Sequence, residues 1–289
     1  METELTLDLP QLLALEKGMT IRNRFLQRVS NIGCNSMNTK YPHSYFYSPP
    51  GTGKTYSIIN HLEKTNQKYV VVSGNVSMYA FMVSLCVVYF LNKEREDIII
   101  VIDDCDEILS TEANCNIMKN ALVGSQTLVY EKSLSSQWQN LNELQKAAIK
   151  SIQSDERSGF IVPCHNMSFV FTSNFKLPID DEVRIAREKN QSKATLLAHK
   201  NAIRSRCNVA DFDLRNEEHF GWIADVVLFT DCLSNQEFIE QEKIEIINFM
   251  WHNWENLTER SIRLVEKMAI ILKQYPNSFD EIWKMDFLK

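Results

Sequence analysis

A glycine-rich loop between a short strand and a helix constrains this chain more than any other part of its sequence. Residues 48–55 read SPPGTGKT, with a strand expected over 44–47 and a helix expected from Lys54. In loops of this kind the backbone N–H groups cradle phosphates, the lysine reaches the terminal phosphates and a hydroxyl binds Mg²⁺. Ser48 stands where the general pattern has its first glycine, but Gly51 and Gly53 still allow the tight turn. The sequence therefore predicts a phosphate-binding loop.

Apolar strands alternate with helical segments around this loop. A helix is expected over 10–30, before the loop. The expected strands after the loop cover residues 68–73, 97–102, 168–172 and 209–214. Strands that are apolar throughout and are joined by helices form a parallel sheet covered on both faces, with ligands at the carboxyl ends of the strands. We therefore predict an α/β P-loop core over residues 1–214.

Two segments differ from this alternation. Residues 126–162 are predicted to be an insertion with a strand at TLVYE, a helix over 141–152 and a loop over 155–159, and no chemistry is assigned to them. From Arg215 on, the chain is predicted to be helical, with an N-cap at Thr258 and apolar residues at helical spacing from Ile262 to Leu272. We therefore predict a small helical lid domain over residues 215–289.

The composition is typical of a globular protein in a reducing compartment. With 44% hydrophobic and 24% charged residues, 289 residues suffice for one large domain or for a large domain with a smaller partner. The net charge of -6 excludes a global basic footprint, so contact with nucleic acid would need a local patch or a surface built by several subunits. The cysteines form no CxxC pair and are expected to be buried thiols: Cys34, Cys86, Cys105, Cys115, Cys164, Cys207 and Cys232.

No targeting or membrane-spanning segment is expected. The N-terminus is acidic and lacks the basic-then-apolar order of a signal peptide. The longest apolar run, residues 78–91, is interrupted only by Ser84 and is shorter than the roughly 20 residues that a bilayer requires. We therefore expect a cytoplasmic protein without membrane contact, and a buried core helix over residues 78–91.

Polar side chains follow two of the expected strands. Asp103 comes after the run IIIVI, as does a carboxylate that a central strand delivers to Mg²⁺ beside a phosphate loop. Asp104 would then orient and deprotonate the attacking water, with Glu107, one turn on, as a weaker substitute. Asn174 ends a later strand and could hold that water or a phosphate through its amide. The alternative for each residue is a solvated turn after a strand.

Two arginines are further candidates for phosphate chemistry. Arg206 ends the basic segment NAIRSRC, and an arginine presented to a neighbour's nucleotide is worth roughly 10³ to 10⁵ in rate in well-studied NTPases. Arg204, in the same segment, is a weaker candidate. Arg263 stands near the start of a C-terminal amphipathic helix, where a lid could reach back to the phosphates. The alternatives are a solvated helix end and a surface arginine.

In this order, SPPGTGKT, IIIVIDDCDE, FVFTSN, AIRSRC and ERSIRL resemble the motifs of AAA+ ATPases, from about Ser44 to the last helix. The resemblance implies that ATP with Mg²⁺ binds between the subunits of a ring, commonly of five or six, and is hydrolysed to ADP and phosphate. The implied roles are Walker B for Asp103 and Asp104, sensor 1 for Asn174, arginine finger for Arg206 and sensor 2 for Arg263. The expected ATP-binding residues are Pro50, Gly51, Thr52, Gly53, Lys54, Thr55 and Tyr56, and the expected Mg²⁺ ligands are Thr55 and Asp103.

Two further details bear on the subfamily. The tripeptide at 205–207 resembles the Ser-Arg-Cys motif of clamp-loader subunits, while the Asp-Asp-Cys-Asp form and the compact size are similar to small AAA+ proteins of viruses and phages. A viral origin would place the protein in the host cytoplasm. Asp104 departs from the family, in which most members have glutamate. Because aspartate is one methylene shorter, and a misplacement near 1 Å can cost roughly 100-fold in rate, hydrolysis is expected to be slow or the water to approach differently.

Three functions remain open at this point. An ATP-driven motor or loader acting on DNA in replication, recombination or packaging is favoured by seven lysines and arginines between Arg184 and Arg206. Glu188 is the one acid within this stretch, and Glu182 lies just before it. The same basic segment could instead line a subunit interface. A protein-remodelling ATPase or adaptor would need an aromatic pore loop, for which Tyr79 and Phe81 are candidates, although core packing suits both. An ATP-gated scaffold with slow turnover is supported by Asp104.

Overall fold

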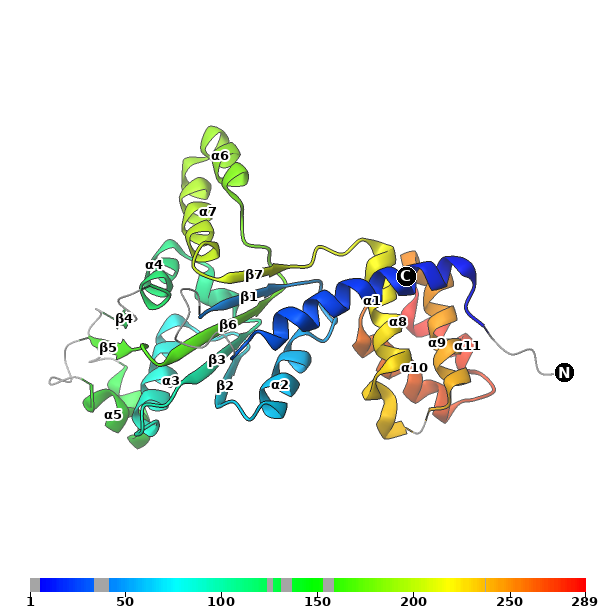
Figure 1. Cartoon of the computed structure of the whole chain (residues 1–289), viewed down its shortest axis with the longest axis horizontal. Helices are drawn as coiled ribbons and strands as arrows, with labels where there is room; N and C mark the ends of the chain where they lie inside the picture. The colour runs from blue at the N-terminus through cyan, green and yellow to red at the C-terminus, as the bar shows by residue number, and fades with distance from the viewer. Residues whose placement is uncertain (1–5, 34–41, 124–126, 131–136, 153–158, 237) are drawn as a thin grey trace. The chain divides into compact units, whose positions relative to one another are not determined.

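The computed structural model describes residues 6–33, 42–123, 127–130, 137–152, 159–236 and 238–289 (Figure 1). The chain forms two compact units. The sheet unit contains Ser30–Tyr47 and Ile58–Asp211, and the helical unit contains Met1–Val29, Ser48–Ser57 and Phe212–Lys289. The predicted division at residue 214 stays a prediction. The N-terminal helix and the glycine-rich loop belong to the same compact unit as the C-terminal helices.

The sheet unit is built on a five-stranded parallel sheet, as predicted. Its strands are β1 (Ser44–Tyr47), β2 (Tyr69–Ser73), β3 (Ile98–Asp103), β6 (Met167–Ser173) and β7 (Asn208–Asp211). Their order in the sheet is β2-β3-β6-β1-β7 (Figure 1). Every residue of β6 is buried, as expected for a central strand with both faces covered.

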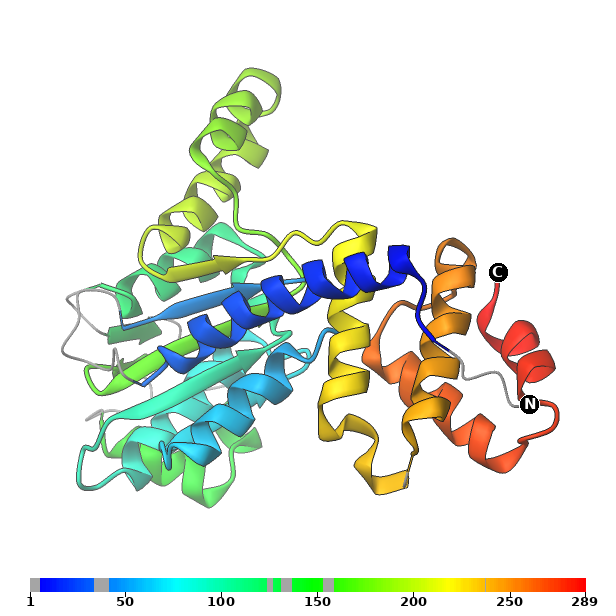
Figure 2. The same ribbon diagram turned by 45° about the vertical axis from the view of Figure 1, so that its right-hand side comes forward.

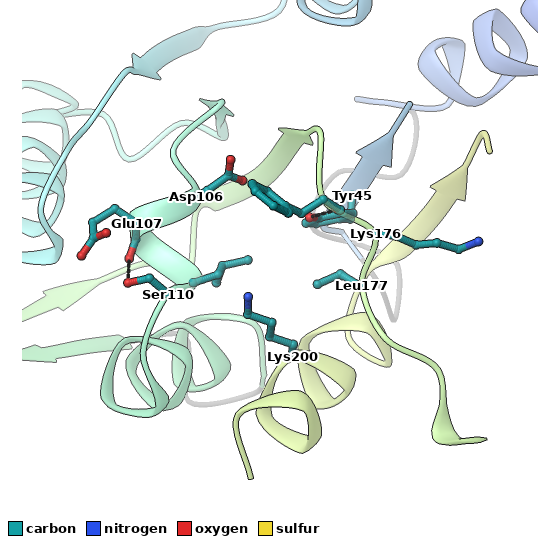
Figure 3. A pocket seen from close by; sticks show the side chains of 9 residues that line it. Tyr45, Asp106, Glu107, Ser110, Lys176, Leu177 and Lys200 are labelled. Carbon is teal, nitrogen blue, oxygen red and sulfur yellow. Dashed lines mark hydrogen bonds between the residues drawn. The ribbon is translucent and has the colours of Figure 1, made fainter. Parts of the chain in front are cut away.

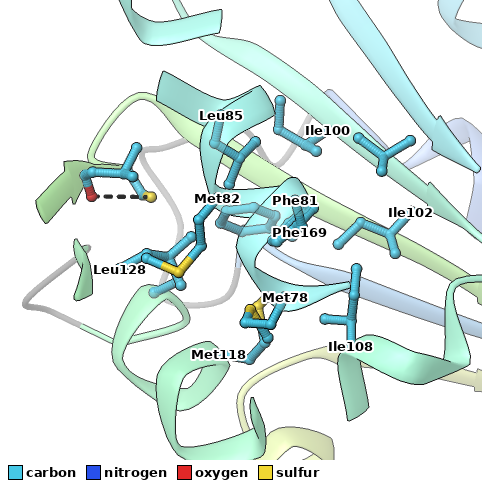
Figure 4. Close-up of a cluster of buried hydrophobic side chains, with 14 of the residues drawn as sticks. Met78, Phe81, Met82, Leu85, Ile100, Ile102, Ile108, Met118, Leu128 and Phe169 are labelled. Carbon is cyan, nitrogen blue, oxygen red and sulfur yellow. Dashed lines mark hydrogen bonds between the residues drawn. The ribbon is translucent and has the colours of Figure 1, made fainter. Parts of the chain in front are cut away.

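Successive residues of the central strands face opposite sides of the sheet. Ile100 and Ile102 of β3, with their register partners Phe169 and Phe171 on β6, belong to the main hydrophobic cluster of this unit (Figure 4). The same cluster includes buried side chains of α3 (Met78–Leu91), α4 (Glu112–Ala121), α5 (Glu143–Lys150) and α7 (Gln191–Arg204). Residues of the other face, such as Val101 and Val170, are buried as well. Both faces are therefore covered.

The apolar run at 78–91 forms α3, a core helix, as predicted. Ser77 caps its N-terminus by accepting a hydrogen bond from the Ala80 N–H. Phe81 is fully buried, and the Tyr79 ring packs against Tyr130 at a centroid distance of 5.2 Å. Both aromatic residues therefore pack in the core, as the alternative to a pore loop predicts. Within the described part of the chain, no helix combines the length and apolar character needed to cross a bilayer.

The predicted insertion has the expected elements where the structure describes it. β4 (Thr127–Tyr130) pairs antiparallel with β5 (Phe160–Pro163), and α5 begins with a capping box at Asn142. The predicted loop at 155–159 lies outside the described residues except for Gly159. Short 3-10 turns cover Asp106–Leu109, Trp138–Asn140, Asp231–Gln236 and Trp254–Asn256.

The basic segment after β6 forms a helical hairpin (Figure 1). α6 (Asp180–Lys189) ends at Asn190, whose side chain then caps α7 by accepting from the Lys193 N–H. α7 packs on α4, where the Lys119 ammonium lies 2.8 Å from Nδ1 of His199. The sequence predicted helical character here but not the hairpin, because the fold of α7 back onto α4 depends on contacts between distant residues.

The helical unit contains α1 (Leu9–Ser30), α8 (Asn216–Phe229), α9 (Glu240–Asn253), α10 (Ile262–Gln274) and α11 (Phe279–Phe287) (Figure 2). α2 (Lys54–Lys64) begins in this unit and continues into the sheet unit. Apolar residues of α1, including Ala14 and Leu15, share one buried cluster with those of the C-terminal helices.

Three predicted boundaries were wrong. The N-cap of α10 is Ser261 and not Thr258, because the Ser261 hydroxyl accepts from the Leu264 N–H in the first turn of the helix. α11 follows α10, which is therefore not the last helix. The strand predicted over 209–214 ends at Asp211, because the Phe212 ring packs in the helical unit, 5.5 Å from Phe25 and 6.0 Å from Trp222.

α1 and α8 cross at two glycines. A Cβ added at Gly18 would lie 2.0 Å from the carbonyl carbon of Gly221, and one added at Gly221 would lie 1.8 Å from the carbonyl oxygen of Ala14. Beside this crossing, Arg22 pairs with the buried carboxylate of Asp225 at 2.7 Å. Only glycine lets the two backbones approach this closely, so the crossing anchors α1 on the lid helices.

We expect Gly221→Ala to lower the free energy of unfolding by about 1–3 kcal/mol, because the new methyl group forces α1 away from α8. Alanine without such a clash would favour the helix by about 1 kcal/mol, so the sign of the change is decisive. Urea unfolding followed by circular dichroism measures it. Glu16→Ala, at an exposed α1 position, is the control and should change stability by less than about 0.5 kcal/mol. A more stable Gly221→Ala protein would contradict the close crossing.

Candidate functional site

The glycine-rich loop joins the last residue of β1, Tyr47, to the first residue of α2, Lys54. Gly51 and Gly53 have φ of 71° and 78°, in the left-handed region that side chains disfavour. Ser48, which replaces the first glycine of the motif, is fully buried, and its Oγ lies 2.6 Å from Oγ1 of Thr52. The departure from the motif is therefore accommodated by a hydrogen bond inside the loop.

Lys54 is buried within the loop. Its ammonium donates to the carbonyl oxygens of Ser48 and Pro49 at 2.9 and 3.1 Å, and the residue is 7% exposed. Phosphate oxygens are stronger acceptors for an ammonium than neutral carbonyls are. The Lys54 ammonium is therefore a positive charge that would attract an anionic ligand to this loop. Among the other predicted ligands, Thr55 lies in the first turn of α2 and Tyr56 is 74% exposed.

The C-terminal helices hold two carbonyls of the loop. The Ile262 N–H donates to the Gly51 carbonyl at 2.9 Å, and the indole N–H of the buried Trp222 donates to the Thr52 carbonyl at 3.0 Å. In a trans peptide the following N–H points opposite to the carbonyl, so both bonds turn N–H groups of the loop toward the other side. A Cβ on Gly51 would also lie 2.1 Å from the Ser261 Cβ. Trp222 and Ser261 thus shape the loop, and no sequence pattern pointed to either.

Arg263 directly follows Ile262 at the start of α10 and is exposed. The hydrogen bond from Ser261 lowers the pKa of Glu259, and Lys267 and the charge of Arg263 lower it further. The predicted lid arginine therefore lies one residue beyond a direct hydrogen bond to the loop. Its role toward a ligand stays a prediction.

His219 lies on α8, one turn before Trp222, and was not predicted. It is 9% exposed, and burial lowers its pKa to about 4, with further lowering by the charges of Arg260 and Lys54. The imidazole is therefore neutral at pH 7 and adds no positive charge near Lys54. Within the described residues, its Nε2 atom has no hydrogen-bond partner.

In the sheet unit, the predicted polar residues meet at the carboxyl edge of the sheet. The Thr172 hydroxyl donates to the Asp103 carboxylate at 2.6 Å, and the Asn174 amide donates to the Asp104 carboxylate at 3.2 Å. Tyr47, after which the loop begins, pairs in register with Ser173. The structure therefore brings Asp103, Asp104 and Asn174 to one edge, together with Thr172.

Asp104 has a φ of 49°, and its N–H donates to the Thr172 carbonyl at 3.2 Å. Aspartate and asparagine are the side chains that best tolerate this left-handed conformation. The backbone at residue 104 thus gives a physical reason for aspartate where glutamate is usual in the AAA+ motifs that the sequence resembles.

The two candidate arginines differ in their contacts. Arg204 pairs with Asp211 at 2.7 Å and also donates to the Leu177 carbonyl. Arg206 folds back on α7, where its guanidinium donates to the Ala202 carbonyl, while within the described residues its buried Nε has no hydrogen-bond partner. Arg204 is therefore committed to its own unit, which leaves Arg206 as the stronger candidate for the finger.

The predicted Mg²⁺ ligands, Thr55 and Asp103, are oxygen donors of the kind that this ion prefers. Among the described residues, no group of three or more His, Cys, Asp or Glu side chains could hold a metal. Mg²⁺ in phosphate-binding proteins takes one or two protein oxygens and completes its shell with water and phosphate. Thr55 and Asp103 suit that pattern, and their roles stay predictions.

We expect Trp222→Phe to weaken binding of a nucleoside triphosphate by roughly 3- to 10-fold, because it removes one neutral hydrogen bond to the loop while keeping an aromatic ring. Calorimetric titration measures the affinity. Trp283→Phe is a matched control, since the buried Trp283 donates one similar bond, at 3.1 Å, to the Met268 carbonyl. Both variants should lose similar stability. Equal affinities of the two variants would show that the Trp222 bond does not shape the loop for the ligand.

The chain is similar to a phage protein of known sequence. It is 27% identical over 238 residues to an uncharacterized 36.7 kDa protein of the nrdC-mobD intergenic region of Enterobacteria phage T4, an alignment that covers 80% of this chain. The chain spans 64% of the length of that relative. Among solved structures, RIF2 of Saccharomyces cerevisiae aligns with a TM-score of 0.40 and 11% identity, over 95% of this chain and 92% of RIF2.

A family model covers the part of the chain that carries the loop and the sheet-edge residues. Residues 44–185 match "ATPase family associated with various cellular activities (AAA)". The matched region runs from β1 through Asp103, Asp104 and Asn174 into α6. Residues 44–185 therefore match an AAA ATPase family domain, and such a domain implies binding of ATP with Mg²⁺.

Proposed function

We propose that the protein binds ATP with Mg²⁺ in the loop 51–55 and hydrolyses it with the residues at the carboxyl edge of the sheet. The observation that carries this proposal is the contact between Asn174 and Asp104, beside Asp103 and its partner Thr172. β1 ends at the same edge and leads directly into the loop. An acidic pair oriented by an amide at this edge suits activation of a water molecule.

Each residue has a separate task in this proposal. Lys54 neutralises the terminal phosphates, and Thr55 and Asp103 hold Mg²⁺, which supplies further charge neutralisation. Asp104 accepts a proton from the attacking water. Asn174 orients the Asp104 carboxylate through its 3.2 Å hydrogen bond. Arg263 acts from the lid on the phosphates.

Asp104→Asn should keep ATP binding and reduce hydrolysis by about 10²- to 10⁴-fold, because an amide cannot accept the proton of water. Asparagine tolerates the left-handed backbone at this position, so the fold should not change. Phosphate release and ATP affinity are measured in parallel, with the exposed Asp97→Asn as control. Turnover like that of the parent protein would move the catalytic role to another group.

Asp104→Glu is the companion variant. Faster turnover would indicate that aspartate falls short of the water, and would favour the alternative of an ATP-gated scaffold with slow hydrolysis for the natural protein. Unchanged turnover would weaken that alternative. The left-handed backbone makes glutamate less favourable here, so the stability of the variant is measured as well.

We further propose that the subunits form a ring, of five or six members, in which Arg206 acts on the nucleotide of a neighbour. The contacts of Arg206 within its own chain support this, because they are local to the end of α7 and the residue is only partly buried. Activity should then rise with protein concentration as subunits assemble. In such a head-to-tail ring, each site takes its loop from one subunit and its finger from the next.

Mixing two inactive variants tests this arrangement. Arg206→Ala should bind ATP but hydrolyse it poorly, and Lys54→Ala should not bind ATP stably, because each lacks one half of the junction. A mixture should recover activity, since an intact loop meets an intact finger at about one quarter of junctions under random mixing. Arg187→Ala, at an exposed position on α6, is the control and should stay active. Constant activity on dilution to monomers, with no recovery in the mixture, would contradict the finger assignment.

The substrate that we propose for this ATPase is DNA, in replication, recombination or packaging. The basic segment 184–206 supports DNA as the substrate. It forms most of the α6–α7 hairpin, and most of its lysines and arginines lie on these two helices. The buried Phe81 and the packed Tyr79 offer no support for a polypeptide-threading loop. Stimulation of turnover by DNA is the corresponding measurement.

A further inference from the structure

A groove in the sheet unit lies between the segment after β6 and the α6–α7 hairpin. It consists of two adjoining pockets of about 300 and 470 Å³ that share Phe175, Lys176 and Lys200. Figure 3 shows the smaller pocket, with Glu107 and Ser110 on one side, Tyr45 and Leu177 on the other, and Lys200 extending into it from α7. The larger pocket continues along the hairpin. Volumes of this size suit a ligand group as large as a nucleobase.

The charges of the groove are unevenly distributed. The larger pocket is lined by Lys176, Lys189, Lys193 and Lys200. Among the described residues that line it, Glu182 is the one acid, and its carboxylate accepts a hydrogen bond from the Ile179 N–H at 2.9 Å. The smaller pocket is lined by Asp106 and Glu107 as well, and Asp106 accepts a hydrogen bond from the Ser173 hydroxyl at 2.8 Å. The hairpin end of the groove is therefore complementary to an anionic ligand.

Apolar side chains are exposed among these lysines. Phe175 is 60% exposed and Ile185 is 47% exposed, and both line the larger pocket. An exposed aromatic ring beside a row of cations is the arrangement with which proteins bind single-stranded nucleic acid, since bases stack on the ring and phosphates contact the cations. A duplex keeps its bases stacked inside and cannot offer them to Phe175.

We infer that this groove binds single-stranded nucleic acid, with a base against Phe175 and the backbone along Lys189 and Lys193. The inference rests on the DNA part of the proposed function and names its binding site. Phe175 directly follows Asn174, and its N–H donates to the Ser173 hydroxyl at 2.9 Å. A strand bound at Phe175 therefore contacts the segment that orients Asp104, which gives it a direct route to alter ATP turnover.

Binding of labelled oligo(dT) to the full chain, measured by fluorescence anisotropy without nucleotide, tests the site. Phe175→Ala should weaken binding about tenfold, within the range for loss of one stacked base. The control is Phe229→Ala, because Phe229 is 63% exposed on α8 of the other unit. It should bind oligo(dT) as the parent protein does.

The lysines are tested through salt dependence. Lys189→Gln with Lys193→Gln should weaken binding and reduce the slope of log affinity against log salt by about 1.4, because two phosphate contacts are lost. The control pair is Lys64→Gln with Lys93→Gln, two exposed lysines elsewhere in the sheet unit. Oligo(dT) should also change the ATP turnover of the parent protein, and Phe175→Ala should reduce that change.

The other outcomes separate the groove from the function. If the parent protein binds oligo(dT) and neither set of variants weakens this binding, the groove is not the binding site, while the proposed DNA role stands. If the parent protein does not bind, both the groove and the DNA role are overturned, while ATP hydrolysis is judged by Asp104→Asn alone. If the variants lose self-association instead, measured by sedimentation, the groove is a subunit interface. Duplex DNA is measured as well. The inference is also overturned if the parent protein binds duplex as tightly as oligo(dT) and Phe175→Ala binds duplex as the parent protein does.

Discussion

The hydrogen bonds from Ile262 and Trp222 to two carbonyls of the phosphate loop are the contacts on which the candidate site depends most. They orient the peptide groups of a segment whose glycines would otherwise allow many conformations. Through Trp222 the loop is tied to α8, and α8 is in turn anchored to α1 at the crossing of Gly18 and Gly221. The packing of the helical unit and the conformation of the loop therefore depend on each other. A shift of α8 at the glycine crossing would also move Trp222 and the loop carbonyl that it binds.

The parallel register of the sheet has the same importance for the acidic residues. Because β3 and β6 pair so that Asp103 lies opposite Thr172, the residues that follow each strand also meet, and Asn174 contacts Asp104. The left-handed backbone at Asp104 completes this arrangement and accounts for the side chain found there. The register of the sheet thus explains the cluster, and the left-handed backbone at residue 104 suits aspartate better than glutamate.

The match of residues 44–185 to the AAA ATPase family model includes the loop as well as Asp103, Asp104 and Asn174. The basic α6–α7 hairpin begins inside the matched region and extends beyond it. The hairpin and the exposed Phe175 are therefore the parts of this chain where a specific task is best sought. Phe175 directly follows Asn174 of the sheet-edge cluster, so a ligand at Phe175 would contact the segment to which we assign the nucleotide chemistry.

The sequence by itself determined the strands, the loop, the order of the motifs and the buried helix at 78–91, because periodicity, glycines and apolar runs are local signals. It placed Asp103, Asp104 and Asn174 at strand ends, although the last two are 70 residues apart. It did not determine the N-cap at Ser261, the helix α11, the end of β7 or the hairpin, since each depends on which distant residues compete for the same backbone. Only the tertiary structure could reveal Trp222, whose partner Thr52 is 170 residues away, because a buried tryptophan in an apolar helix carries no local sign of the carbonyl that it binds.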